Sequence, residues 1–138
     1  DVWFFAAPND IVAKLPCIAR LGYRLSHPEY NARNLPPIED FDLVITSSDN
    51  SSLGLRGLIP PWQTYTSVDI ALQESEWQHT QTAVPASAQE LQSTLQQATR
   101  LLIRGGFYAG NEVASVDQLV VHVRPDCTSQ PKHVSAEA

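Results

Sequence analysis

Residues 41–46 read Phe-Asp-Leu-Val-Ile-Thr, and this stretch decides the expected fold. A continuous run of apolar and β-branched residues is typical of a strand that is buried on both faces, as in a parallel sheet. Residues 2–7, Val-Trp-Phe-Phe-Ala-Ala, show the same pattern and end at Pro8. Both segments are therefore predicted to be central strands of a parallel sheet.

Around these two runs, strand and helix patterns alternate along the chain. A helix that contains Pro16 is expected after Pro8, and a helix over 87–104 is expected because Ser87 and Glu90 have the spacing of a capping box. The remaining expected elements are strands at 23–26, 64–72 and 80–84, a weak helix at 53–59 and a final helix at 111–123. This order predicts an α/β fold, a five-stranded parallel doubly wound sheet of the flavodoxin or receiver type with an extra C-terminal helix.

Composition limits the classes of function. The chain has 138 residues, 43% of them apolar, and a net charge of −6, which favours one globular domain and disfavours direct binding to nucleic acid. There is neither a secretory leader nor an apolar run of the roughly 20 residues that a membrane helix needs, so a cytoplasmic location without membrane contact is expected. Cys17 and Cys127 are interpreted as structural or incidental residues that make neither a disulfide framework nor a metal site, and no metal is expected at the scattered histidines.

The chain resembles an atypical receiver domain of a LuxR-type response regulator, most closely in the style of the biofilm-matrix regulators. The resemblance rests on the strand before Pro8, the strand at 42–45, the helix at 87–104 and the junction Leu-Ile-Arg-Gly-Gly-Phe-Tyr at 102–108. It implies a receiver-like domain over 1–106, a linker or dimerisation helix over 107–124, and a polar linker over 125–138. That linker is expected to lead to a DNA-binding domain that this chain lacks.

The resemblance also implies that the phosphorylation chemistry has been lost. A working receiver holds Mg²⁺ with acidic residues after the first strand, phosphorylates an aspartate after the third, and uses a lysine after the fifth. The corresponding positions here are Ala6, Ala7, Ser47 and Val84, none of which can take these roles. No enzymatic activity and no cofactor are expected, and the predicted function is a phosphorylation-independent regulatory domain of a transcription regulator.

Two further interpretations concern partners. The stripe Val113, Val116, Val120 and Val123 has helical spacing and is a candidate dimer seam, so a homodimer or a signalling protein is the expected partner. Residues Arg104, Phe107 and Tyr108 are candidate ligand contacts, because the related regulators bind cyclic di-GMP near this position. Two alternatives stay open: a protein-interaction module of a hybrid sensor histidine kinase, and a sensor of a small molecule or of cyclic di-GMP.

Overall fold

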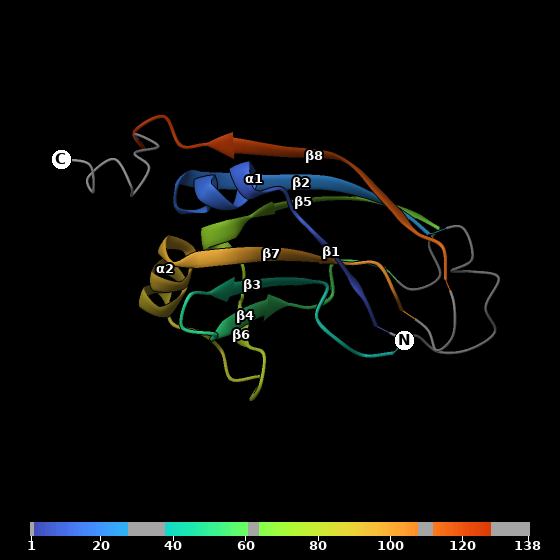
Figure 1. Ribbon diagram of the computed structural model, residues 1–138, viewed down its shortest axis with the longest axis horizontal. Coiled ribbons are helices and arrows are strands. Elements are labelled where there is room, and N and C mark those ends of the chain that lie inside the picture. Colours follow the sequence, from blue (N-terminus) through green and yellow to red (C-terminus); the bar gives the residue numbers. More distant parts are fainter. Residues whose placement is uncertain (1, 28–37, 61–63, 108–111, 128–138) are drawn as a thin grey trace.

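A computed structural model describes residues 2–27, 38–60, 64–107 and 112–127 of the chain (Figure 1). Its strands form two sheets. The larger sheet has the order β1-β7-β3-β4-β6 and contains β1 (Phe4–Ala6), β7 (Ala98–Arg104), β3 (Leu43–Ser47), β4 (Ser52–Leu55) and β6 (Gln78–His79). The smaller sheet has the order β5-β2-β8 and contains β5 (Tyr65–Ala71), β2 (Ile18–Ser26) and β8 (Ser115–Val123).

Every strand pairing within the described residues is antiparallel. The expected parallel doubly wound sheet is therefore wrong, and the molecule is a sandwich of two antiparallel sheets that share one core. The described helical elements are short: α1 (Asn9–Lys14), α2 (Ala88–Gln96), and the 3₁₀ turns η1 (Leu15–Cys17) and η2 (Leu72–Glu74). None of the described helices is long and apolar enough to cross a membrane.

The strand at 41–46 is present as β3, but its apolar run has a different cause from the one expected. Leu43 and Ile45 face the smaller sheet and are fully buried. On the other face, Val44 pairs with Gly54, and a Cβ at Gly54 would lie 2.5 Å from the Phe41 ring. The ring therefore covers the outer side of this sheet, and β3 is buried on both faces although its neighbours are antiparallel.

The expected helix over 87–104 is correct only in its first half. Ser87 and Glu90 do form the capping box: the Glu90 N–H donates to the Ser87 hydroxyl at 3.0 Å and the Ser87 N–H donates to Glu90 Oε1 at 2.8 Å. The helix ends at Gln96, and the chain continues as β7. In β7, Leu101 and Ile103 alternate into the core, which is the two-residue period of a strand.

The first part of the chain is also divided differently from the prediction. Pro16 lies in η1 and ends the helical segment, so that β2 begins at Ile18, where a helix was expected. The segment at 2–7 supplies β1, an edge strand of three residues and not a central one. The weak helix at 53–59 is replaced by β4, and the short strand at 80–84 by β6 and a turn.

The expected helix over 111–123 is wrong, because residues 115–123 form β8 and pair with β2. Gly22 of β2 pairs with Val120 of β8, and the next pair is Arg24 with Asp117. The step is two residues on β2 and three on β8, so β8 carries one extra residue, a β-bulge. Gln118, with φ of 53°, takes up this bulge. The residues of β8 that pack on the core are therefore Val116, Leu119 and Val121, and not the helically spaced valines from which the helix was expected.

The bulge provides a test of whether residues 115–123 form a strand or a helix, because one substitution should change the free energy of unfolding in opposite directions in the two cases. We expect Gln118→Gly to raise the free energy of unfolding by about 1 kcal/mol, because glycine adopts a positive φ without the steric cost that glutamine bears. In a helix the same change would lower it. Gln92→Gly within α2 is the matched control and should lower the free energy of unfolding by about 0.5–1 kcal/mol. Urea denaturation of both variants measures the two signs, and destabilisation by Gln118→Gly would contradict the bulge.

Candidate functional site

Four ionisable side chains are buried together at one end of the sandwich. His27 follows β2, Arg104 ends β7, Asp42 precedes β3 and Glu112 lies before β8. Their side chains are between 1% and 7% exposed. Charged groups are rarely buried so completely unless they are paired, and these four are called the buried polar cluster below.

Arg104 is the centre of one half of the buried polar cluster. Its Nη1 lies 3.7 Å from Asp42 Oδ1, its Nε donates to the Gly106 carbonyl at 2.9 Å, and its Nη2 donates to the Ile38 carbonyl. The other Asp42 oxygen accepts from the Leu58 N–H at 2.8 Å. Burial raises the pKa of Asp42, while the Leu58 N–H and Arg104 act in the opposite direction.

Tyr23 responds to the same surroundings. It is 2% exposed on the inner face of β2, and burial raises the pKa of its phenol, with the Asp42 carboxylate adding to the rise. The phenol therefore stays neutral at physiological pH and is not available as a base.

His27 and Glu112 form the other half. His27 Nε2 lies 2.9 Å from the Gly105 carbonyl and 3.1 Å from Glu112 Oε2, and because both neighbours are acceptors Nε2 must carry a proton. The Glu112 carboxylate accepts from the Phe107 N–H at 2.8 and 3.0 Å. The Phe107 ring lies edge-on to His27 at 4.6 Å and 4.3 Å from the Arg104 guanidinium carbon, so it joins the two halves.

The buried polar cluster ties together backbone from distant parts of the chain. Besides the side-chain contacts, the His27 N–H donates to the Thr64 carbonyl at 2.6 Å, and the Ile38 N–H donates to the Phe107 carbonyl at 2.6 Å. Residues on both flanks of 28–37 and of 108–111 are thus held at the same end. The arrangement can fix chain segments in place, and its four ionisable side chains are almost completely buried.

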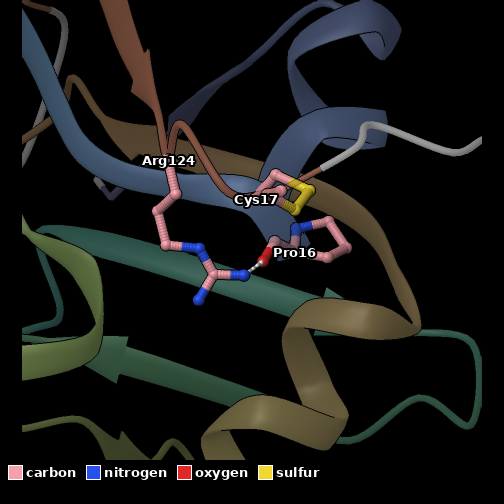
Figure 2. Close-up of a disulfide and its surroundings, with 4 residues drawn as sticks. Pro16, Cys17 and Arg124 are labelled. Carbon is pink, nitrogen blue, oxygen red and sulfur yellow. Dashed lines mark hydrogen bonds between the residues drawn. A yellow bond between two sulfur atoms is a disulfide. The ribbon is translucent and has the colours of Figure 1, made fainter.

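A disulfide fastens the last described residues to the first half of the chain. Cys17 in η1 is bonded to Cys127, with 5.6 Å between their Cα atoms and a sequence separation of 110. Figure 2 shows Arg124 beside the bond, where its Nη2 donates to the Pro16 carbonyl at 3.2 Å. The Arg124 N–H also donates to the Cys17 carbonyl at 2.8 Å. The interpretation of the two cysteines as incidental is therefore wrong.

The residues predicted to replace a phosphorylation site do not come together. Ala6 and Ala7 lie at the end of β1, and Val84 is bonded through its carbonyl to β6, at the opposite edge of the sheet. Ser47 ends β3, is 3% exposed and donates to the Asp49 carboxylate. Within the described part of the chain, the four positions expected at a lost active site are therefore not gathered into one site.

The other predicted positions are placed as follows. Val113, Val120 and Val123 are 64%, 47% and 40% exposed, whereas Val116 is partly buried and packs on the core, so the four valines do not share one face. Arg104 and Phe107 do lie together, but both are buried. Tyr108 lies outside the described residues.

Sequence reasoning missed His27, Asp42, Glu112 and the disulfide. The one signal for Asp42 was a carboxylate inside an otherwise apolar strand, because such a residue needs a buried cation. Within the described ranges, no three His, Cys, Asp or Glu side chains are arranged to hold a metal ion. A cleft of about 470 Å³ lies beside Trp77, but Trp77 is 2% exposed and its indole N–H is bonded to the Leu72 carbonyl.

Comparison with known proteins agrees with the sandwich. The family model for laminin B (domain IV) matches residues 19–129. A solved structure, the L4b domain of human laminin alpha-2, covers 91% of this chain and 72% of its own length with a TM-score of 0.67. The two sequences are 13% identical, so this likeness concerns the fold alone. No curated protein matches the chain.

These matches overturn the receiver interpretation. A response-regulator receiver has neither this family model nor this antiparallel sandwich, and the predicted roles in transcription regulation, in a sensor kinase and in cyclic di-GMP sensing depended on that resemblance. Part of the error had a physical source, because β3 is buried on both faces and so has the sequence pattern of a parallel strand.

The buried polar cluster predicts a large difference between two arginine variants. Arg104→Leu leaves Asp42 buried without its cation, and such a change typically costs about 3–5 kcal/mol. Arg20→Leu, the matched control, removes an exposed pair with Asp69 at 3.1 Å and should cost less than about 1 kcal/mol. Guanidinium denaturation measures both losses, and equal losses would show that the cluster does not stabilise the fold.

Proposed function

The chain belongs to the laminin B (domain IV) family, and we propose that it acts as a structural contact module of an extracellular protein. Laminin domains are extracellular, and a disulfide fits a secreted protein, so the expected cytoplasmic location is wrong. The proposed module works by keeping a fixed shape and presenting its surface, without enzymatic activity.

The observation that carries this proposal is where the molecule places its ionisable groups. The ionisable groups of the buried polar cluster are paired with backbone carbonyls, with backbone N–H groups and with one another, and this pairing stabilises the fold. The exposed charges on the smaller sheet are paired as well: Arg20 with Asp69, and Arg24 with both oxygens of Asp117 at 3.0 and 3.1 Å. Such a surface suits contact with another protein.

The disulfide provides the test of an extracellular module. The full chain, expressed behind a secretory leader, should reach the medium without free thiols. Replacing both cysteines by alanine should lower the free energy of unfolding by about 2–4 kcal/mol, because the disulfide closes a long loop in the unfolded chain. Reductant should lower the free energy of unfolding of the wild type by a similar amount. It should not change that of the alanine variant, which therefore serves as the control for other effects of the reductant. Free thiols in the secreted protein, or equal stability of both forms, would contradict the proposal.

The contact surface supported best is the edge of β8 that has no neighbouring strand, together with the exposed side chains along it. The partner proposed is a second copy of the chain. In the described residues β8 pairs with β2 alone, which leaves its other edge without a strand. Val113, Val120 and Val123 are exposed along this segment, and Asp117, its one carboxylate between 115 and 123, is paired with Arg24. A two-fold contact would therefore bring apolar side chains together without unpaired like charges.

Sedimentation equilibrium tests this contact. We expect the wild type to dimerise reversibly and Val120→Lys to weaken the dimer at least tenfold, because a charge would enter an apolar seam. Val84→Lys is the matched control: Val84 is 54% exposed but lies away from β8, and its change should leave association unaltered. A monomeric wild type, or equal weakening by both variants, would overturn the second-copy partner.

A further inference from the structure

The turn between β3 and β4 carries the exposed residue Asn50, and the neighbouring Asp49 holds the turn in place. Asp49 accepts from the hydroxyls of Ser47 and Ser51 and from the Ser51 N–H, the latter two at 2.6 and 3.0 Å. These hydrogen bonds lower the pKa of Asp49 to about 2, so the turn is held by a carboxylate that stays ionised. Asn50 lies inside this loop with φ of 69°, and its N–H donates to the Ser47 carbonyl at 3.0 Å.

The Asn50 side chain is not used by the fold. The residue is exposed, and its amide makes no hydrogen bond to any described residue. Asparagine tolerates the left-handed backbone better than most residues, which explains why asparagine occurs in the turn. This preference does not explain why a serine stands two positions later.

Residues 50–52 read Asn-Ser-Ser, which is the acceptor pattern Asn-x-Ser/Thr for N-linked carbohydrate, and the pattern occurs once in the sequence. In an intracellular protein this match would carry no meaning. Here it coincides with an extracellular family, a disulfide, and an exposed turn that can hold a bulky group in solvent.

We propose that Asn50 is an N-glycosylation site. The side-chain amide nitrogen would attack the anomeric carbon of an oligosaccharide carried on a lipid diphosphate. A carbon–nitrogen bond forms, the carbon–oxygen bond to the diphosphate breaks, the lipid diphosphate leaves with the electron pair, and the amide gives one proton to the transferase. Ser52 supplies the hydroxyl of the pattern. In the folded chain that hydroxyl lies 2.5 Å from Thr80 Oγ1, so the transferase would meet it without this partner only before β4 and β6 pair.

The surroundings of Asn50 suit an attached sugar. A polar hollow of about 300 Å³ lies beside it, lined in part by Ser52, Thr80 and Thr82, whose hydroxyls match those of a carbohydrate. The Ser48 N–H donates to the Gln97 carbonyl at 2.9 Å, which fixes the turn against the end of α2. β3 separates this turn from Asp42, so the carbohydrate would cover the end of the sandwich opposite the buried polar cluster (Figure 1).

The test uses the full chain secreted from eukaryotic cells, and it rests on the extracellular location proposed above. Wild type and Ser52→Thr should lose mass on treatment with peptide N-glycosidase, and the treated peptide should carry aspartate at position 50. Asn50→Gly, which keeps the positive φ, and Ser52→Ala should both show a complete loss of this mass shift.

Each result decides one point. A secreted, disulfide-bonded wild type without carbohydrate overturns the glycosylation site and leaves the extracellular module standing. A mass shift that persists in Asn50→Gly also overturns the site. A chain that is retained in the cell with free thiols contradicts the extracellular module itself. Secretion of Asn50→Gly at the wild-type level, with the same unfolding midpoint after deglycosylation, shows that the lost mass shift does not come from misfolding.

Discussion

The burial of Arg104 is the constraint on which the rest of this structure depends. A guanidinium group cannot lose its charge at any pH that a protein meets, so it is buried only where oxygen atoms surround it. Those oxygens come from Gly106, which lies two residues after Arg104, and from Ile38 and Asp42, which lie on the segment that leads into β3. The hydrogen bonds and the ion pair of this one side chain therefore fix where β7 ends and where the segment before β3 lies.

The neighbouring half of the cluster follows from the same constraint. Phe107 lies against Arg104, and the position of its backbone N–H determines where Glu112 must be. Glu112 in turn places His27 at the end of β2, which belongs to the other sheet. Polar contacts consequently align the two sheets at one end, whereas the Cys17–Cys127 bond, near the other end of β2, ties β2 to β8 within the smaller sheet.

The sequence allowed local features to be predicted where a single segment determines them. The strands at β3 and β5 and the capping box of α2 were predicted, because each depends on residues within one short stretch. Strand direction was not predictable in this way, since burial of Val44 comes from Phe41 and Gly54, not from a parallel neighbour. The bulge at Gln118 and the pairing of Cys17 with Cys127 depend on β2, and the cluster depends on four distant segments, so no local pattern reveals them.

The disulfide also determines how the molecule would carry a mechanical load. A pull applied before β1 and after Cys127 would pass from Cys127 directly to Cys17, because the covalent bond bypasses the chain between them, a sequence separation of 110. Of the residues that the structure describes, those before Cys17, with β1 and α1, lie in the path of the force, and β1 is attached to β7 along three residue pairs. Fully extended, those residues would lengthen the chain by at most about 55 Å, at roughly 3.3–3.6 Å per residue. Under tension the segment before Cys17 would therefore extend, while the sandwich between the two cysteines, which the disulfide bypasses, would bear almost no load.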